Sequence, residues 1–296
     1  MHIFKRTIEK SIQEKLFKGK IITILGPRQS GKTTLSKRLI KEFSEKGAYF
    51  NCELLDIRNV LVPREPNLLY EKIKNYKIVV LDEAQTVEDI GLILKNFIDT
   101  YQDIQIVATG SSSFDLANKV NEPLTGRAYE FMLYPLSVSE AKEYSIEEFL
   151  TYGSYPGVVT EDEKNKLENL RNIATNYLYK DIFNFENIRK PIVFEKLVKT
   201  LAREIGGQIS TDRLAKILDT NKATIERYIA LLEQAFIIKR LYSFSRNLTK
   251  ELKKSYKVYF LDIGLRNILA DDVVPPNKRA DNGKIFENFF IMERIK

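Results

Sequence analysis

Apolar runs and helical patterns alternate along the first half of the chain. Short apolar runs rich in β-branched residues, with helical spacing between them, occupy residues 20–25, 48–54, 76–84 and 104–113. A fifth apolar run lies within residues 128–136. Strands that alternate with helices are typical of a parallel sheet whose two faces are covered by helices. The pattern therefore predicts an α/β fold in which helices sandwich a parallel sheet.

The second half of the chain changes to a helical pattern from about residue 162. Ser210 or Thr211 can cap a helix that runs to Leu218, and a short turn then leads to a second helix over 222–234. The apolar run that follows, AFIIKRLYSF, is typical of a strand. The order helix, turn, helix and strand predicts a winged-helix module.

The C-terminal stretch GKIFENFFIMERIK predicts an amphipathic helix. Its apolar positions recur near helical spacing, at Ile285, Phe286, Phe289, Phe290 and Ile295. Residues 273–284, which contain two prolines, polar residues and a glycine, predict a linker before this helix. We interpret the stretch as the first helix of a domain that this sequence does not contain.

Length and composition fit a division into domains. At 296 residues the chain is long enough for two domains of ordinary size. Its content of 44% hydrophobic and 29% charged residues suits a globular protein with a large core. We expect a sheet domain over 1–160, a helical and winged-helix domain over 161–260, and a third, incomplete part over 261–296.

The sequence also disfavours several classes of protein and site. No apolar run approaches the ~18 residues of a membrane helix, and the charged N-terminus has no signal-peptide core. These features predict a cytoplasmic protein with no membrane partner. His2 is the single histidine and Cys52 the single cysteine, so a zinc site, a histidine-based triad and an internal disulfide are not expected.

Positive charge is concentrated in one third of the chain. Residues 161–260 hold 20 lysines and arginines against 13 acidic residues, whereas the remainder holds 27 of each kind. Within the predicted winged helix this charge lies in 239–257, at Lys239, Arg240, Arg246, Lys250, Lys253, Lys254 and Lys257. DNA is therefore a candidate partner, contacted through phosphates more than through base edges. A solvated surface or a protein-contact module is the alternative.

The segment GPRQSGKTT lies between the first predicted strand and a helix. It fits the phosphate-loop pattern, in which glycines let the backbone N–H groups converge on phosphates at the positive end of the helix. Lys32 is expected to reach the β- and γ-phosphates, and Thr33 to ligate Mg²⁺. The residues of this segment expected to bind ATP are Gly26, Pro27, Arg28, Gln29, Ser30, Gly31, Lys32, Thr33 and Thr34.

A second element of the same chemistry is IVVLDEA, a buried strand that ends in two acids. Asp82 is expected to hold the Mg²⁺ shell as a Walker-B aspartate, and Glu83 to orient or deprotonate the attacking water. The next predicted strand ends in hydroxyls. Thr109, Ser111 or Ser112 can sense the γ-phosphate there or serve only as strand-end caps, and Ser111 is our candidate.

These residues carry a resemblance to a known family. The segments GPRQSGKTT, LDEAQ, ATGSSS, LTGRAYEFMLYPLS and YGSYPGVV together resemble a broad family of bacterial and archaeal AAA-superfamily, STAND-like ATPases. The resemblance covers essentially the whole chain and implies a P-loop domain, a winged helix and a C-terminal nuclease-like region. Arg127 looks like the family's Gly-Arg position, which implies an arginine that steadies the γ-phosphate in cis or from a neighbouring subunit. Gly153, Tyr155 and Pro156 are expected to form a turn at the domain junction.

Taken together, the motifs predict a Mg²⁺-dependent ATPase that couples its nucleotide state to the winged helix, with a homo-oligomer as a possible assembly. Two alternatives stay open. The first is a low-turnover, nucleotide-gated switch that holds a protein partner, and the second is the ATPase part of a DNA-processing nuclease. Glu83 favours real hydrolysis over a pure switch.

The nuclease alternative depends on the C-terminal stretch. In the family that the chain resembles, a segment like GKIFENFF opens the nuclease-like domain, and its glutamate matches Glu287. Glu293 is the other acid that follows, and its spacing from Glu287 places the two on different faces of one helix. We therefore expect no nuclease activity with Mg²⁺ or Mn²⁺. We expect the stretch to be poorly ordered, or to dock its phenylalanines on the winged helix or another chain.

Overall fold

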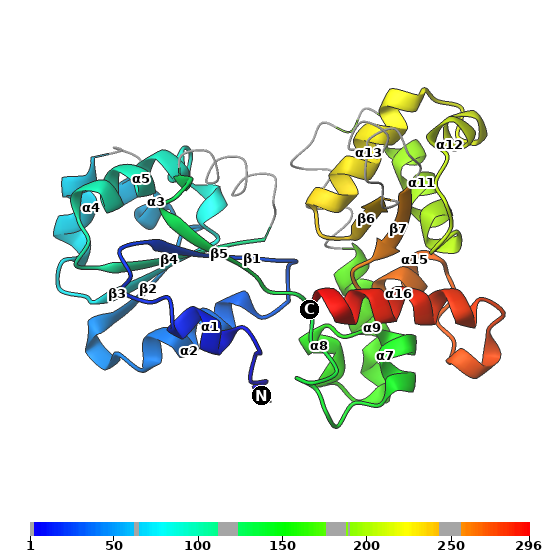
Figure 1. The fold of residues 1–296 in the computed structure, drawn as a ribbon, viewed down its shortest axis with the longest axis horizontal. Helices are drawn as coiled ribbons and strands as arrows, with labels where there is room; N and C mark the ends of the chain where they lie inside the picture. Colours follow the sequence, from blue (N-terminus) through cyan, green and yellow to red (C-terminus); the bar gives the residue numbers. More distant parts are fainter. Residues whose placement is uncertain (1–2, 62–64, 112–123, 176–187, 189, 243–255) are drawn as a thin grey trace. The chain divides into compact units, whose positions relative to one another are not determined.

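The computed structural model describes residues 3–61, 65–111, 124–175, 188, 190–242 and 256–296. The chain forms two compact units that meet in sequence between Tyr134 and Pro135 (Figure 1). This division lies well before residue 160, the boundary expected from the sequence. The reason is that α7 (Ile146–Tyr152) packs against α15 (Ile263–Leu269), which belongs to the second unit.

The first unit is built on a five-stranded parallel sheet. Its strands are β1 (Ile21–Leu25), β2 (Gly47–Asn51), β3 (Ile78–Asp82), β4 (Gln105–Gly110) and β5 (Ala128–Met132). They stand in the order β2-β3-β4-β1-β5, and every pairing is parallel. The predicted α/β fold with a parallel sheet is confirmed. β1, β3 and β4 are buried along their whole length, which explains their continuous apolar runs.

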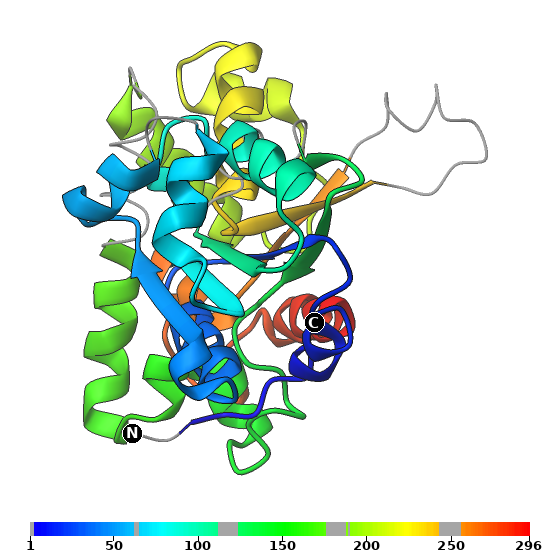
Figure 2. The same cartoon turned by 90° about the vertical axis from the view of Figure 1, so that its left-hand side faces the viewer.

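Helices cover both faces of this sheet (Figures 1 and 2). One face carries α1 (Glu9–Gln13) and α2 (Lys32–Lys41). The other carries α3 (Leu55–Leu61), α4 (Pro66–Ile73) and α5 (Ile90–Thr100). The core on the first of these faces holds Ile12, Ile22, Ile24, Leu35, Leu39, Ile78, Val80, Val107 and Leu133. Because the strands are parallel, the segments that follow β1, β3 and β4 meet at one edge of the sheet, where ligands bind in such folds.

The second unit is mainly helical. Besides α7 and α15 it contains α8 (Pro156–Val159), α9 (Glu163–Thr175), α11 (Pro191–Arg203), α12 (Thr211–Ile217), α13 (Lys222–Gln234), β6 (Ile238–Tyr242), β7 (Tyr256–Phe260) and α16 (Asn282–Ile295). Short 3₁₀ turns complete the chain, at Ser44–Lys46 and Ala84–Thr86 in the first unit and at Pro276–Lys278 in the second. Among the described residues, none of the helices has the length and apolar character needed to cross a bilayer.

The helix–turn–helix–strand order lies where the sequence predicted it. The Ser210 hydroxyl accepts the N–H of Arg213 at the start of α12, and the Asn221 side chain accepts the N–H of Thr224 at the start of α13. β6 then pairs antiparallel with β7. The segment between these strands, 243–255, lies outside the described residues, and with it most of the basic residues assigned to the wing. The winged-helix assignment therefore stays a prediction.

The turn between α7 and α8 is a packing site inside the second unit rather than a joint between domains. Gly153 has φ +77°, and a Cβ on it would lie 2.1 Å from Asp262 Oδ1. Asp262 Oδ2 accepts hydrogen bonds from the N–H (2.7 Å) and the hydroxyl (3.0 Å) of Ser154, while Oδ1 accepts the N–H of Leu265 at the start of α15 (2.9 Å). Burial raises the pKa of Asp262, and these hydrogen bonds oppose that rise.

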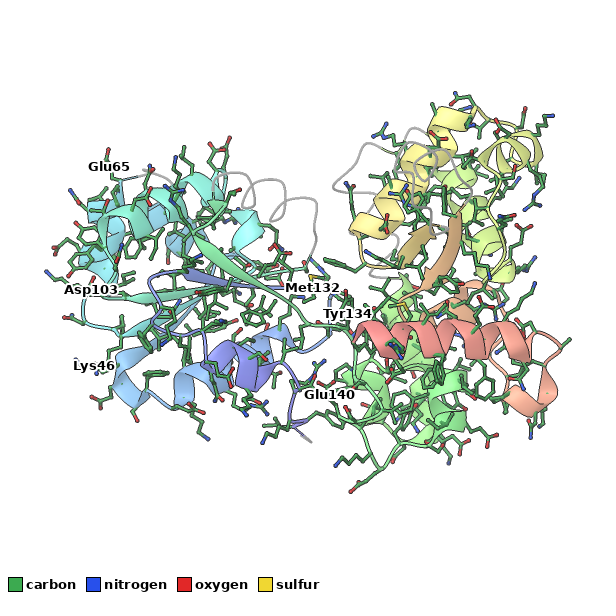
Figure 3. The ribbon with its side chains drawn as sticks, in the orientation of Figure 1. Lys46, Glu65, Asp103, Met132, Tyr134 and Glu140 are labelled. Atoms are coloured by element: carbon green, nitrogen blue, oxygen red, sulfur yellow. The ribbon has the colours of Figure 1, made fainter. Side chains whose placement is uncertain are left out.

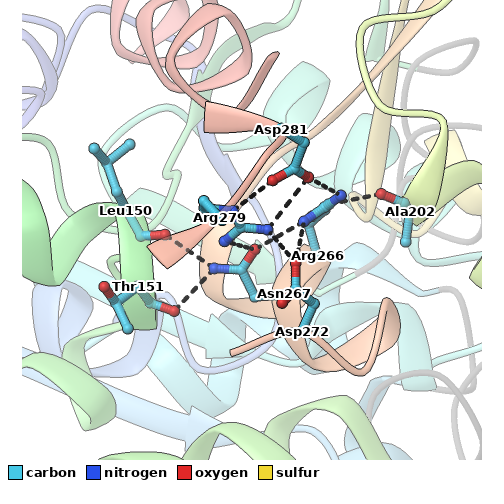
Figure 4. Close-up of polar contacts among 8 residues, drawn as sticks. All are labelled: Leu150, Thr151, Ala202, Arg266, Asn267, Asp272, Arg279 and Asp281. Atoms are coloured by element: carbon cyan, nitrogen blue, oxygen red, sulfur yellow. Dashed lines mark hydrogen bonds and ion pairs between the residues drawn. The ribbon is translucent and has the colours of Figure 1, made fainter. Parts of the chain in front are cut away.

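A buried polar cluster fixes the segment that leads from α15 to α16 (Figure 4). The side chains of Arg266 and Arg279 are only 2% and 1% exposed, and both bind Asp281, at 2.7 and 2.6 Å. Arg266 Nε also donates to the carbonyl oxygen of Ala202 on α11, and Asn267 Nδ2 donates to two carbonyls at the end of α7. The cluster therefore ties α7, α11 and α15 together, and removal of one partner would leave a buried charge uncompensated.

The C-terminal helix, α16, docks on its own unit. It packs against β7, α15 and α7, with Ile285, Phe289 and Met292 buried. Phe289 lies 5.9 Å from the ring of Phe149 on α7, whereas Phe290 remains 67% exposed. The stretch is therefore docked, one of the two outcomes expected. Its buried phenylalanine packs on α7, however, and not on the winged helix or another chain.

The two acids of α16 have separate partners in the second unit. Glu287 Oε1 accepts hydrogen bonds from Lys257 Nζ (2.8 Å) and the Tyr259 hydroxyl (2.6 Å), both on β7. Glu293 accepts the N–H of Val138 and pairs with Lys296, each at 2.9 Å. Both carboxylates therefore take part in packing contacts of α16.

Candidate functional site

The phosphate-loop sequence joins β1 to α2 at the carboxyl edge of the sheet. Gly31, which stands directly before α2, has φ +98°, a conformation that residues with a side chain rarely adopt. At Gly26 a Cβ would lie 2.1 Å from the carbonyl oxygen of Leu133, so only glycine fits. Backbone conformation therefore requires glycine at position 31, and the close approach of Leu133 requires it at position 26. The first N–H groups of α2 lie at the end of this loop.

Lys32 is buried beside the loop, with 4% of the residue exposed. Its Nζ donates to the carbonyl oxygens of Gly26 and Pro27, each 2.9 Å away. Burial lowers the pKa of Lys32 to about 8, although Glu83 and Asp82 nearby favour its charged form. An ammonium has three N–H donors, so one remains for an anion after both carbonyls are bound. Lys32 therefore fits a phosphate ligand.

Thr33 and Asp82 come together from α2 and the end of β3. The Thr33 hydroxyl donates to Asp82 Oδ2 at 2.8 Å. The hydroxyl of Tyr49 on β2 donates to the same oxygen, and that of Thr109 on β4 donates to Oδ1. Hydroxyl and carboxylate oxygens are ligands that Mg²⁺ prefers. Since its proton is bound by Asp82, the Thr33 oxygen keeps its lone pairs for a cation, and the pair fits a Mg²⁺ ion.

Glu83 is held at the same edge in a strained conformation. Its φ of +52° lies in the left-handed region, which is costly for a residue with a side chain and recurs at functional sites. Its Oε2 accepts hydrogen bonds from Gln85 Nε2 (2.5 Å) and the Ser111 hydroxyl (3.0 Å). Among the described residues nothing donates to Oε1, so that oxygen can accept a proton from water. Ser112, named above as an alternative to Ser111, lies outside the described residues.

The remaining loop residues differ in exposure. Gln29 and Thr34 are exposed, Arg28 is half-buried, and Pro27 and Ser30 are buried. The Ser30 hydroxyl has no hydrogen-bond partner among the described residues, as expected of a donor that a ligand would satisfy. Arg28 contributes to the low pKa of Lys32, so it lies within electrostatic range of the site.

Arg127 lies at the opposite edge of the sheet, which corrects the predicted role in cis. It directly precedes β5, and its carbonyl oxygen accepts the N–H of Ile21 at the start of β1, whereas the phosphate loop follows the end of β1. Figure 3 shows the two edges, with Lys46 and Asp103 before their strands, Met132 at the end of β5 and Tyr134 after it. A five-residue strand spans about 17 Å. The Arg127 guanidinium instead pairs with Asp99 at 2.6 Å, with both side chains about 40% exposed.

Arg127→Ala is therefore expected to keep ATP turnover within about twofold of the parent, because an exposed ion pair contributes at most about 1 kcal/mol. Steady-state turnover at low protein concentration measures this directly. A large loss of turnover that recovers when Arg127→Ala chains are mixed with Glu83→Gln chains would contradict the expectation. It would assign Arg127 to the site of a neighbouring copy.

Three residues of the site were not identified from the sequence. Tyr49 reaches Asp82 because β2 pairs with β3 so that Asn51 lies opposite Asp82. Gln85 belongs to the LDEAQ segment, and its position two residues after Glu83 could have indicated a contact with that carboxylate. Arg6, from the segment before β1, donates to the carbonyl oxygen of Ser30 in the phosphate loop, and no sequence pattern points to this contact.

The basic segment 239–257 is described only at its ends. Lys239 and Arg240 both pair with Glu233, and Lys257 pairs with Glu287. The other four basic residues, Arg246, Lys250, Lys253 and Lys254, lie outside the described residues. Each of the three described basic residues of this segment thus already has a carboxylate partner. Less positive charge is therefore left for nucleic acid than the sequence suggested.

Comparisons with known proteins agree with the geometry of the first unit. Residues 18–142 match the AAA domain family. Residues 143–273 match a domain of unknown function. A solved structure, the Walker-type ATPase of Pyrococcus abyssi, is similar in fold, with a TM-score of 0.63 and 17% identity over 90% of this chain and 96% of that one. The first unit therefore has the fold of an AAA-type P-loop ATPase.

Relatives in sequence include longer proteins. An uncharacterized protein of Mycobacterium tuberculosis is 26% identical over 301 residues, which is 100% of this chain and 66% of the relative. An uncharacterized protein of Haemophilus influenzae is 27% identical over 93% of this chain and 74% of the relative. The chain thus spans slightly less than two thirds of the length of the mycobacterial relative.

Proposed function

We propose that the protein is a Mg²⁺-dependent ATP hydrolase. The observation that supports this most strongly is the meeting of Lys32, Thr33, Asp82 and Glu83 at one edge of the sheet, with a separate chemical role available to each. The match of residues 18–142 to an AAA domain supports the same reaction class.

The residues divide the work between binding and proton transfer. Lys32 and the N–H groups at the start of α2 bind the phosphates, and Lys32 exchanges its bonds to loop carbonyls for bonds to phosphate oxygens. Thr33 and Asp82 would hold Mg²⁺, which supplies charge neutralisation of the phosphates when bound. Glu83 accepts the proton of the attacking water through Oε1, while Gln85 and Ser111 fix its other oxygen.

Two narrower functions receive less support. A nucleotide-gated switch would need no base, yet Glu83 Oε1 receives no hydrogen bond from the described residues, which favours hydrolysis. DNA contact rests on the charge of 239–257, where the described residues are paired with carboxylates. The proposed function therefore does not include DNA as a partner, and an assay with and without duplex DNA tests that choice.

We expect ATP turnover to require Mg²⁺ and to stop when the metal is chelated. Because Thr33 and Asp82 are hard oxygen ligands, Mn²⁺ should restore activity after chelation. Phosphate release measured against metal concentration provides the test. Thr33→Val serves as a matched variant of nearly the same volume and should raise the metal concentration needed. Turnover that persists in excess chelator would contradict the proposal.

A further inference from the structure

Arg6 contacts the phosphate loop from outside the region that matches the AAA domain. It lies before α1, upstream of residues 18–142, and is 7% exposed. Its Nη1 donates to the carbonyl oxygen of Ser30 at 2.7 Å, and its Nη2 donates to the carbonyl oxygen of Tyr134 at 2.5 Å. A single guanidinium thus bridges the nucleotide-binding loop and the last residue of the first unit.

The bond to Ser30 determines where the next N–H group points. A trans peptide is planar, and its C=O and N–H groups point in opposite directions. Because the Ser30 carbonyl is directed at Arg6, the N–H of Gly31 is directed away from Arg6. A Cβ on Gly31 would lie 3.6 Å from Arg6 Nη1, so the guanidinium packs closely behind this peptide. Arg6 therefore holds the Ser30–Gly31 peptide in one orientation, which phosphate binding by backbone N–H groups requires.

The bond from Arg6 to Tyr134 lies beside direct contacts between the start of the loop and the segment that ends β5. The N–H of Leu133 donates to the carbonyl oxygen of Leu25 at 2.7 Å, directly before the loop. Gly26 approaches Leu133 so closely that no side chain fits between them. Tyr134, labelled in Figure 3, is the residue after which the chain passes to the second unit. A displacement of the loop by a ligand would therefore act on the segment that leads to that unit.

The segment that carries Arg6 is itself fixed to α2. Arg38 on α2 forms an ion pair with Glu9, and its Nη1 donates to the carbonyl oxygen of Phe4 at 3.0 Å. These contacts lie on either side of Arg6, so the position of its guanidinium is set by the helix that begins with Lys32. Arg6 is thus held by the same helix whose N-terminus forms part of the phosphate site.

We propose that Arg6 is a positioning residue that fixes the Ser30–Gly31 peptide for phosphate binding and couples the phosphate loop to the Leu133–Tyr134 segment. The proposal rests on the nucleotide site proposed above. It predicts that Arg6 affects ATP binding more than the chemical step, because the loop contacts substrate and transition state alike.

The test compares Arg6→Gln with Lys5→Gln, which removes an equal charge from the neighbouring exposed position. Arg6→Gln should raise KM for ATP and its dissociation constant about tenfold with kcat nearly unchanged, whereas Lys5→Gln should match the parent. Hydrogen exchange provides a second readout. ATP should slow exchange of the Leu133 amide in the parent, and this effect should be lost in Arg6→Gln.

Arg6→Lys keeps the charge but has one ammonium in place of a two-armed guanidinium, so it should recover part of the affinity without restoring the effect on Leu133. This variant also serves if Arg6→Gln does not fold. If either Arg6 variant kept the parental ATP affinity and the parental effect of ATP on exchange at Leu133, this inference would be overturned while the proposed function would stand. Failure of the parent protein to bind ATP would instead overturn the proposed function together with this inference.

Discussion

Glu83→Gln is expected to bind ATP with parental affinity and to hydrolyse it about 100- to 10,000-fold more slowly, the range typical of a lost general base. Glutamine has nearly the same shape as glutamate, and its carbonyl oxygen can still accept the bonds from Gln85 and Ser111. An amide oxygen cannot take up the proton of the attacking water at neutral pH. Single-turnover hydrolysis under excess enzyme separates this chemical step from ATP binding.

The matched control for this substitution is Glu88→Gln. Glu88 follows the same strand but is exposed, so its replacement changes the net charge equally without touching the site. We expect parental turnover for this control. If Glu83→Gln hydrolysed ATP as fast as the parent, Glu83 would have no part in the reaction and the nucleotide-gated switch would become the better interpretation.

The strands and the phosphate loop could be predicted because their signals are local. A strand buried on both faces is mostly apolar, and β1, β3 and β4 have that pattern apart from a few polar residues. Gly26 and Gly31 are required by the backbone itself. The strand order was not predicted, since it depends on contacts between segments that are distant in sequence.

The hydrogen-bond partners of Asp82 could not be predicted for the same reason. Asp82 is bound by hydroxyls from three different elements, at Thr33, Tyr49 and Thr109. The pairing of β2, β3 and β4 brings Tyr49 and Thr109 to Asp82, and α2 brings Thr33. The contacts of Arg6 are even harder to predict. Both of its acceptors are backbone carbonyl oxygens, which every residue type has.

The position of Arg127 far from the phosphate loop of its own chain could have been predicted from the sequence. The residue directly precedes a predicted strand, whereas the phosphate loop directly follows one. In a parallel sheet these positions lie at opposite edges, so a role in cis was already excluded once the parallel sheet was predicted. A resemblance to a family motif indicates which residue to examine, but strand direction decides whether it can reach the site.

Lys32→Ala is expected to lower ATP affinity about 100-fold or more. A hydrogen bond to a charged group contributes about 1.5–3 kcal/mol, and contacts to two phosphates would together exceed the ~2.7 kcal/mol that corresponds to 100-fold. Calorimetric titration measures the change. Lys41→Ala, at an exposed position of the same helix, is the matched control and should bind as the parent does. Equal affinities of Lys32→Ala and Lys41→Ala would remove Lys32 from the site.

The low pKa of Lys32 makes this binding depend on pH. Burial lowers the pKa to about 8 in the free protein, and bound phosphates would raise it because they favour the ammonium form. Well below pH 8 Lys32 is already charged, so affinity should be constant there. Above pH 8 the protein must take up a proton to bind, and affinity should fall by up to about tenfold per pH unit. Titrations in buffers of different ionisation enthalpy would detect this proton uptake, which Lys32→Ala should lack. A parental affinity that stays constant to about pH 9.5 would show that the ammonium is not the group that binds phosphate.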